Sequence, residues 1–155
     1  MINNLSKDNC YNYMNKALNL AKLSGKDIPV GALIICNNEI IGCGYNQREN
    51  QHDATAHAEI VAIRQACEYM QSWRLTNSVI FSTLEPCPMC TEAIIQARIG
   101  KIYFGAYDYT LEVLNLTKNL FNSRRGYPIP EIIGGIMEEE CSQLLLEYFK
   151  NEVRV

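Results

Sequence analysis

Two short motifs contain residue types and spacings that suit a metal-dependent hydrolytic centre. One contains His57 and Glu59, and the other contains Cys87 and Cys90. Cys87 and Cys90 are three residues apart, so on a helix they share one face. Pro88 suits the first position of a helix, which makes Cys87 the cap residue and places both sulfurs at the helix start. The partial positive charge of a helix N-terminus favours thiolates, the form of cysteine that binds zinc. The spacing therefore predicts a pair of metal-binding thiolates.

The first motif supplies a nitrogen donor and an acid. His57 and Glu59 are two residues apart, roughly 200° around a helix, so only at a first turn can both lean toward one point. One histidine and two cysteines are typical of a catalytic zinc that keeps its fourth position for a water or hydroxide. A structural zinc would need a fourth protein ligand, and none is spaced with these three. We expect one zinc per chain, held by His57, Cys87 and Cys90, with Glu59 as the catalytic proton carrier.

Length and composition favour one globular domain over residues 1–155, of which 48% are hydrophobic and 20% charged. No apolar run reaches the roughly 20 residues of a membrane span, and the first ten residues do not resemble a secretory signal. An odd number of cysteines, seven, favours thiols over disulfides, so we expect a cytoplasmic protein without membrane association. The net charge of -3 is no general sign of nucleic-acid binding, so a nucleic-acid substrate would need a local basic patch.

Helical and strand patterns must position these motifs, and they alternate along the chain. Apolar periodicity and turn residues predict helices over 8–24, 56–70, 88–97 and 137–151. Strands are predicted over 28–36, 39–45, 78–83, 101–106 and 131–136, the first two joined by a turn at 37–38. Residues 107–130 are the least legible, with a short helix expected over 112–121. This order predicts an α/β fold of three layers, α/β/α, with a mixed sheet of about five strands.

Two helices have apolar stripes that indicate which face each should bury. Ser6 is the expected cap of the first helix, and Gly25 is expected to end it. The stripe of this helix consists of Tyr11, Met14, Leu18 and Ala21. In the second helix the expected stripe consists of Ile60, Ile63 and Cys67.

Longer motifs resemble a known family. The chain contains IPVGALI from Ile28, HDATAHAEI from His52, TLEPCPMC from Thr83, ARIGKIYFGA from Ala97 and EIIGGIMEEECSQLLLEYF from Glu131, which includes an acidic-Cys-Leu closing helix. The HAE and PCxxC pieces are shared across the cytidine and deoxycytidylate deaminase superfamily. The TLEPC phrase, the RIG-to-FGA stretch and the closing helix are similar, more narrowly, to the bacterial tRNA-specific adenosine deaminases.

This resemblance implies a cytidine-deaminase-like fold and hydrolysis of the wobble adenosine in a tRNA anticodon to inosine, with release of ammonia. The partner would be the tRNA anticodon stem-loop, and the enzyme would be a homodimer with its active site close to the subunit interface. Glu59 would pass a proton from water to N1 of the base and another to the departing amine. The resemblance also implies three substrate-binding residues: Asn46 through its side-chain amide, Ala58 through its backbone N–H, and Asp108 beside the substrate strand.

One segment departs from the family pattern. After Gly105-Ala106 the family has a lysine and a glycine-rich loop, whereas this chain has Tyr107 to Glu112. Candidate RNA contacts are two arginines and three possible stacking partners, namely Arg124, Arg125, Tyr107, Tyr109 and Tyr127.

Two other functions stay open. A deaminase of a free base or nucleoside, of guanine or cytosine type, is one, because such enzymes also carry PVGA, TAHAEI and EPCPMC. A non-catalytic zinc module is the other, although its chain should lack the acid that Glu59 provides.

Overall fold

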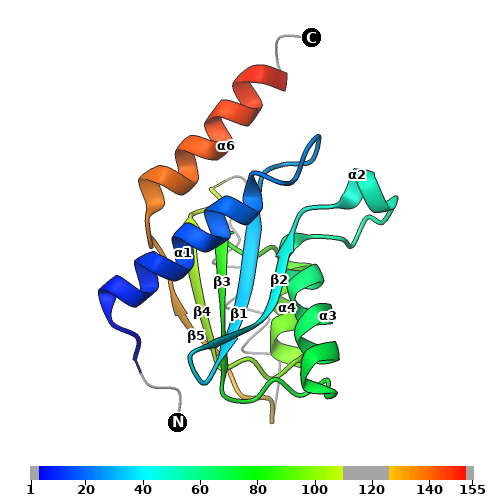
Figure 1. Cartoon of the computed structure of the whole chain (residues 1–155), viewed down its shortest axis with the longest axis vertical. Helices are drawn as coiled ribbons and strands as arrows, with labels where there is room; N and C mark the ends of the chain where they lie inside the picture. The colour runs from blue at the N-terminus through cyan, green and yellow to red at the C-terminus, as the bar shows by residue number, and fades with distance from the viewer. Residues whose placement is uncertain (1–3, 110–125, 153–155) are drawn as a thin grey trace.

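A five-stranded mixed sheet forms the centre of the protein in a computed structural model that describes residues 4–109 and 126–152 (Figure 1). Along the sheet the strand order is β2-β1-β3-β4-β5. The β1 strand is antiparallel to β2 and β3, whereas β3, β4 and β5 run parallel. The strands are β1 (Gly31–Cys36), β2 (Glu39–Tyr45), β3 (Ser78–Leu84), β4 (Lys101–Ala106) and β5 (Glu131–Ile133).

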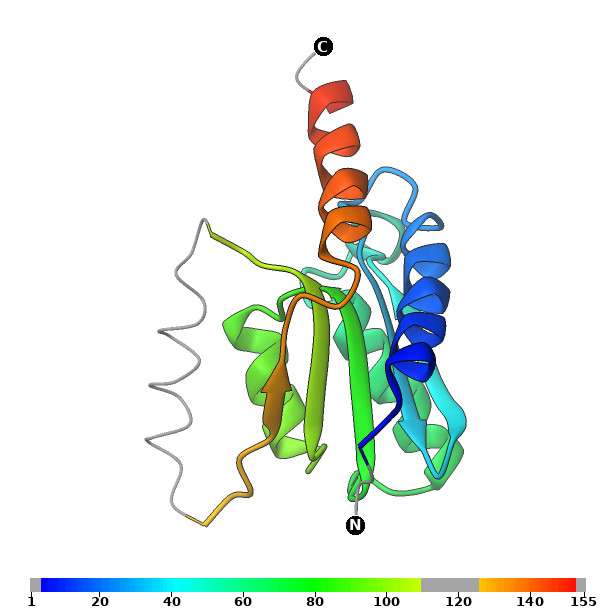
Figure 2. The ribbon, with the colours of Figure 1, turned by 90° about the vertical axis from the view of Figure 1, so that its left-hand side faces the viewer.

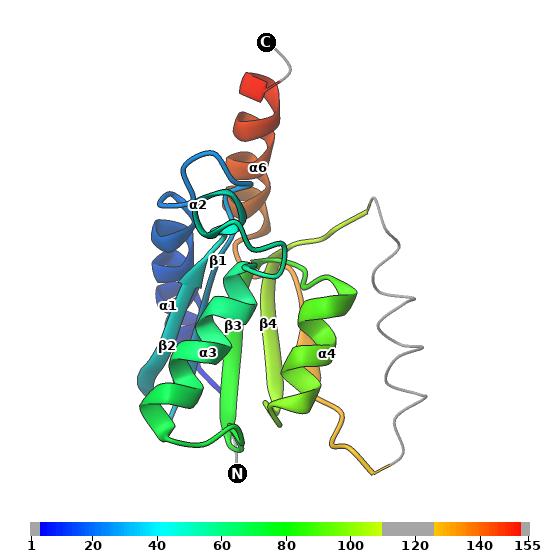
Figure 3. The same cartoon turned by 90° about the vertical axis from the view of Figure 1, so that its right-hand side faces the viewer.

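Helices cover both faces of this sheet, as Figures 2 and 3 show from opposite sides. On one face lie α1 (Lys7–Ala21) and α6 (Glu138–Glu152), and on the other lie α3 (Ala58–Met70) and α4 (Pro88–Gln96). The short α2 helix (Arg48–Gln51) belongs to the connection between β2 and α3. The predicted three-layer α/β/α architecture is thus confirmed. None of the helices in the two described ranges is long and apolar enough to cross a membrane.

Strand alternation divides the apolar core between the two faces. In β1, Ala32 and Ile34 pack on the α3 and α4 side, whereas Leu33 and Ile35 pack on the α1 side. All six residues of β1 are buried, as are all six of β4, because both strands are covered on both faces. A sheet covered in this way is a rigid support for groups placed at the ends of its strands.

Several predicted boundaries differ from the observed ones. The α1 helix begins after Ser6, whose side chain accepts from the amide of Asn9 as an N-cap, and it ends at Ala21 rather than near Gly25. The first strand starts only at Gly31, and the predicted loop after β2 contains α2. The turn at Asn37 and Asn38 is confirmed, with positive φ angles of 51° and 65°. The helix expected over 112–121 lies outside the described residues.

Packing corrects both predicted stripes. In α1, Met14, Leu18 and Ala21 are buried as expected, but Tyr11 is 41% exposed. In α3, the predicted Ile60, Ile63 and Cys67 are only partly buried, and the fully covered residues are Ala58, Glu59, Ala62 and Ala66.

Small residues let α3 lie unusually close to the sheet. A side-chain carbon on Gly42 would collide with the backbone of Ala62, and one on Gly44 would collide with the backbone of Ala58 and Ala62. The helix therefore packs its alanine face directly on the two glycines of β2. This contact fixes the first turn of α3, which carries the acid of the predicted site.

We expect Gly44→Ala to lower the free energy of unfolding by about 3 kcal/mol, because the added methyl meets backbone atoms that cannot move independently. Denaturant titration of the two proteins measures the change. Gly25→Ala is the matched control, since no atom lies within 4 Å of its new carbon and only the positive φ of 62° is unfavourable. The free energy of unfolding of that control should fall by only about 1 kcal/mol. Equal decreases in the two variants would contradict the close-packing explanation.

Candidate metal centre and active site

Two helix starts meet at one end of the sheet. His57 occupies the cap position of α3 in an extended conformation, with φ -71° and ψ 154°. Cys87 occupies the cap position of α4, and Pro88 is the first helical residue. Both helices begin at the end of the sheet where β3 finishes, side by side on the same face (Figure 3). The structure thus brings the two sequence motifs together in the way that their spacing predicts.

The three predicted ligands form one compact cluster. His57 Nδ1 lies 3.6 Å from the sulfur of Cys87 and 3.6 Å from the sulfur of Cys90, and all three donor atoms lie within 4.8 Å of one another. Tetrahedral zinc with bonds of about 2.3 Å to sulfur and about 2.0–2.1 Å to nitrogen separates such donors by about 3.6 Å. Both the donor types and their spacing therefore fit zinc. In the described part of the chain the cluster contains no fourth histidine, cysteine or carboxylate.

The protein groups alone already favour one thiolate in this cluster. A hydrogen bond from the Cys90 thiol lowers the pKa of Cys87 to about 4, and His57 adds to the effect. The pKa of Cys90 is raised, because its proton is held by Cys87 and because the side chain is buried. The pKa of His57 is raised chiefly by its hydrogen bond with Cys87. A bound metal would replace the shared proton between the sulfurs.

Glu59 lies beside the cluster and is only 4% exposed. The hydroxyl of Ser82 donates to Glu59 Oε1 at 3.0 Å, which fixes the carboxyl group from the β3 side. Burial raises the pKa of this carboxyl group. Ser82 lies outside the two sequence motifs, although strand alternation places it on the same face as Ile80, toward α3.

Asn46 connects three segments around the start of α3. Its backbone N–H donates to Val30 O at 3.1 Å, and its side-chain Nδ2 donates to Ile28 O at 2.8 Å. Its Oδ1 accepts from the backbone N–H of Ala58 at 2.9 Å. Asn46 thus lies next to the predicted centre and also holds the first residue of α3 in place.

We expect Asn46→Ala to lower the free energy of unfolding by about 2 kcal/mol, because the buried N–H of Ala58 loses its acceptor. Thermal or denaturant unfolding measures the loss. Asn50→Ala, at an exposed position in α2, is the control and should stay within about 0.5 kcal/mol of the parent protein. A change at Asn46 as small as that at Asn50 would contradict the role of Asn46 in holding α3.

Asp108 lies just beyond β4, where Glu85 binds it. The backbone N–H of Asp108 donates to Glu85 Oε2 at 2.9 Å, and Glu85 N donates to Ala106 O at 2.8 Å. Glu85 is 5% exposed, and its pKa is raised mainly by this burial. Glu85 is not among the predicted site residues, although a carboxylate two residues before a metal-binding cysteine could have indicated it.

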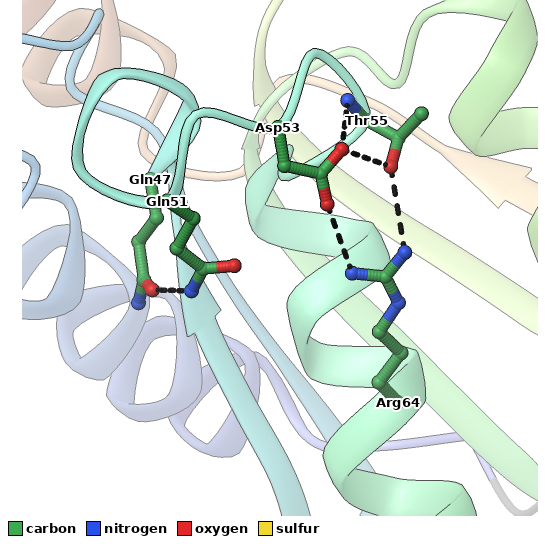
Figure 4. Close-up of polar contacts among 5 residues, drawn as sticks. All are labelled: Gln47, Gln51, Asp53, Thr55 and Arg64. Carbon is green, nitrogen blue, oxygen red and sulfur yellow. Dashed lines mark hydrogen bonds and ion pairs between the residues drawn. The ribbon is translucent and has the colours of Figure 1, made fainter.

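An exposed polar cluster braces the loop that leads to His57, as Figure 4 shows. Asp53 Oδ1 accepts from the backbone N–H and the hydroxyl of Thr55, at 2.8 and 2.7 Å. Arg64 reaches back from α3 to Asp53 Oδ2 at 3.3 Å and to Thr55 Oγ1 at 3.4 Å. The hydrogen bond from Thr55 lowers the pKa of Asp53. Nearby, the side chains of Gln47 and Gln51 are hydrogen-bonded (Figure 4).

The remaining candidate RNA contacts have different surroundings in the structure. Tyr107 packs edge-on against Phe104, with ring centres 4.9 Å apart, while Tyr109 is 80% exposed. Arg98 lies over the ring of Tyr127 at 4.4 Å, so that ring has a protein partner. Arg124 and Arg125 lie outside the described residues. A cleft of about 580 Å³ adjoins Asn46, and Asp27, Gln47 and His52 are among its lining residues.

Known proteins are similar to this chain over most of its length. The family model of the cytidine and deoxycytidylate deaminase zinc-binding region matches residues 7–106. The tRNA-specific adenosine deaminase of Bacillus subtilis is 36% identical over 140 residues, which cover 89% of this chain and 87% of that protein. The enzyme of the same name from Buchnera aphidicola subsp. Baizongia pistaciae is 39% identical over 145 residues, covering 92% and 90% of the two chains.

A solved structure is also similar. It comes from biochemical and structural studies of A-to-I editing by tRNA:A34 deaminases at the wobble position of transfer RNA, and its TM-score with this chain is 0.80. The two chains are 34% identical, and the match covers 86% of this chain and 99% of the other. The chain therefore belongs to the cytidine and deoxycytidylate deaminase family, and within it is similar to the tRNA-specific adenosine deaminases.

Proposed function

We propose that this protein hydrolyses the wobble adenosine of a tRNA anticodon to inosine and releases ammonia. The observation that carries the reaction is the buried Glu59 beside a cluster of one histidine and two cysteines with the spacing of zinc ligands. The relatives support the substrate, because they are named as tRNA-specific adenosine deaminases and match the chain over most of its length.

In this proposal, His57 Nδ1 and the sulfurs of Cys87 and Cys90 hold the zinc ion. When bound, zinc supplies an electrophilic centre that makes a water molecule acidic enough to act as a nucleophile near neutral pH. Three protein ligands leave room for the reacting oxygen, unlike the four ligands of a structural site. The helix starts at Cys87 and His57 keep the donors in place.

Glu59 moves the protons. Its carboxylate takes one proton from the attacking water and delivers it to N1 of the adenine ring, and a second proton goes to the departing amine. The C6–O bond forms, the bond from C6 to the exocyclic nitrogen breaks, and ammonia leaves. Ser82 orients the carboxylate through Oε1, and the buried surroundings exclude bulk water from this proton path.

Substrate contacts are proposed for Asn46, Ala58 and Asp108. Asn46 Nδ2 carries a second hydrogen besides the one given to Ile28 O, and this N–H is suited to an acceptor on the base. The backbone N–H of Ala58 donates to Asn46, so a base acceptor there would share that donor. Asp108 would contact the sugar–phosphate strand beside the base. The cleft next to Asn46 offers space for neighbouring nucleotides.

The test is a comparison of substrates with zinc-loaded protein. We expect nucleoside mass spectrometry to find inosine in a tRNA whose wobble base is adenosine, while free guanine and cytosine remain unchanged. Turnover of guanine or cytosine with no inosine in tRNA would overturn the proposal and favour a free-base deaminase.

We also propose a cytoplasmic homodimer. The family resemblance motivates both statements. Light scattering of the purified chain should give the mass of two copies. A monomer at micromolar concentration would contradict the dimer.

A further inference from the structure

Glu85 is a buried carboxylate that the proposed reaction does not use. It lies between β3 and the metal-binding Cys87, and it is 5% exposed. Neither of the two ion pairs found among residues 4–109 and 126–152 includes Glu85. Because removing a carboxylate from water is unfavourable unless it is well paired, its burial here needs a specific partner.

That partner is the backbone just after β4. Glu85 Oε2 accepts from Asp108 N at 2.9 Å, and Glu85 N donates to Ala106 O at 2.8 Å. One residue therefore binds this segment at two points, two residues apart. Hydrogen bonds to an ionised acceptor are among the stronger ones in proteins, so this contact is suited to fixing a chain position.

Ring contacts also hold this segment, since the ring centres of Tyr107 and Tyr109 lie 6.0 Å apart. The β4 ladder ends at Ala106, and the ring of Tyr107 packs on Phe104. Tyr109 is 80% exposed. The carboxylate of Glu85 thus holds the backbone at Asp108, next to the ring contacts of Tyr107.

We propose that Glu85 is a positioning residue, which holds Asp108 at a fixed distance from the metal-binding Cys87. In this way it determines how tightly the substrate strand is bound. This inference rests on the proposed function, in which Asp108 contacts substrate. Since Glu85 and Cys87 belong to the same short connection between β3 and α4, one segment would align both the metal-binding centre and the contact with the substrate strand.

The test uses two substitutions of equal length in the full, zinc-loaded chain. Glu85→Met removes the acceptor, whereas Glu85→Gln retains an oxygen that can accept from Asp108 N. We expect Glu85→Met to raise the KM for tRNA about tenfold with kcat changed less than twofold and zinc content unchanged, and we expect Glu85→Gln to restore the KM. An unchanged KM in Glu85→Met, or an equal rise in both variants, would overturn the proposal.

Hydrogen exchange tests the contact independently of activity. The amide of Asp108 should exchange at least about tenfold faster in Glu85→Met than in Glu85→Gln, and equal exchange would overturn the proposed anchor. If the parent protein does not act on tRNA, the proposed function fails, while this comparison still decides whether Glu85 holds the segment. If Glu85→Met does not fold, Glu85→Ala removes the same acceptor without adding volume.

A double substitution tests whether Glu85 acts through Asp108. Asp108→Ala removes the proposed substrate contact, so adding Glu85→Met to it should raise the KM less than twofold further. A full additional tenfold rise would show that Glu85 acts elsewhere and would overturn its assignment as a positioning residue for Asp108.

Discussion

Glu59→Gln is expected to lower kcat about a thousandfold, because the amide cannot take a proton from water or pass one to the base. The substitution keeps the shape of the side chain and an oxygen that can accept from Ser82, so the protein should remain folded. Zinc content should also remain at about one ion per chain, because Glu59 is not among the three clustered donors. Single-turnover formation of inosine in tRNA measures the effect.

Glu68→Gln is the matched control for this result. It lies on the same helix, on an exposed position, and makes the same chemical change far from the first turn. We expect its kcat to equal that of the parent protein. Glu59→Gln with more than one tenth of the parent kcat would contradict the assignment of Glu59 as proton carrier.

Cys87→Ala should remove zinc almost completely and lower the thermal stability of the protein. Two of three donors remain, but the sulfur at the start of α4 is lost, and metal binding stabilises only the folded chain. Metal analysis of the purified variant should find less than about one tenth of an ion per chain. Removing zinc from the parent protein with a chelator should lower its melting temperature toward that of the variant.

Cys67→Ala controls for the loss of a thiol. Cys67 is a partly buried cysteine of α3 outside the cluster, and its substitution should leave about one zinc per chain. A Cys87→Ala protein with full zinc content would refute the ligand assignment. Equal loss in both variants would show that zinc content depends on folding rather than on Cys87.

The metal cluster could be predicted because local geometry determines it. Pro88 marks the start of a helix, and this places Cys87 and Cys90 together without knowledge of the rest of the fold. The two-residue separation of His57 and Glu59 similarly requires a helix start, which is what the structure has. Only the meeting of the two helices depends on the sheet between them.

The buried face of α3 could not be predicted from periodicity. The larger residues Ile60, Ile63 and Cys67 suggested the core-facing stripe, but the helix turns its alanines inward. The reason lies in another element, since Gly42 and Gly44 of β2 leave space only for small side chains. A stripe of alanines and two glycines in separate elements reveals their contact only when the strand and helix are known to pack together.

The residues that support the site through hydrogen bonds could not be predicted from local sequence patterns either. Ser82 and Glu85 act through hydrogen bonds to Glu59 and Asp108, which are more than twenty residues away along the chain. Asn46 was expected to face the substrate, whereas its hydrogen bonds to Ile28 and Ala58 add a structural role that depends on three segments. Such long-range polar pairs have no fixed spacing in sequence.

Position-resolved conversion of tRNA tests the proposed function most directly. Zinc-loaded protein is incubated with a tRNA whose wobble base is adenosine and with the same tRNA carrying guanosine there, and sequencing reads inosine as guanosine at every position. We expect conversion at the wobble adenosine of the first tRNA, none at its other adenosines and none in the second tRNA. Conversion at other adenosines, or none at the wobble position by protein that contains one zinc per chain, would contradict the proposal.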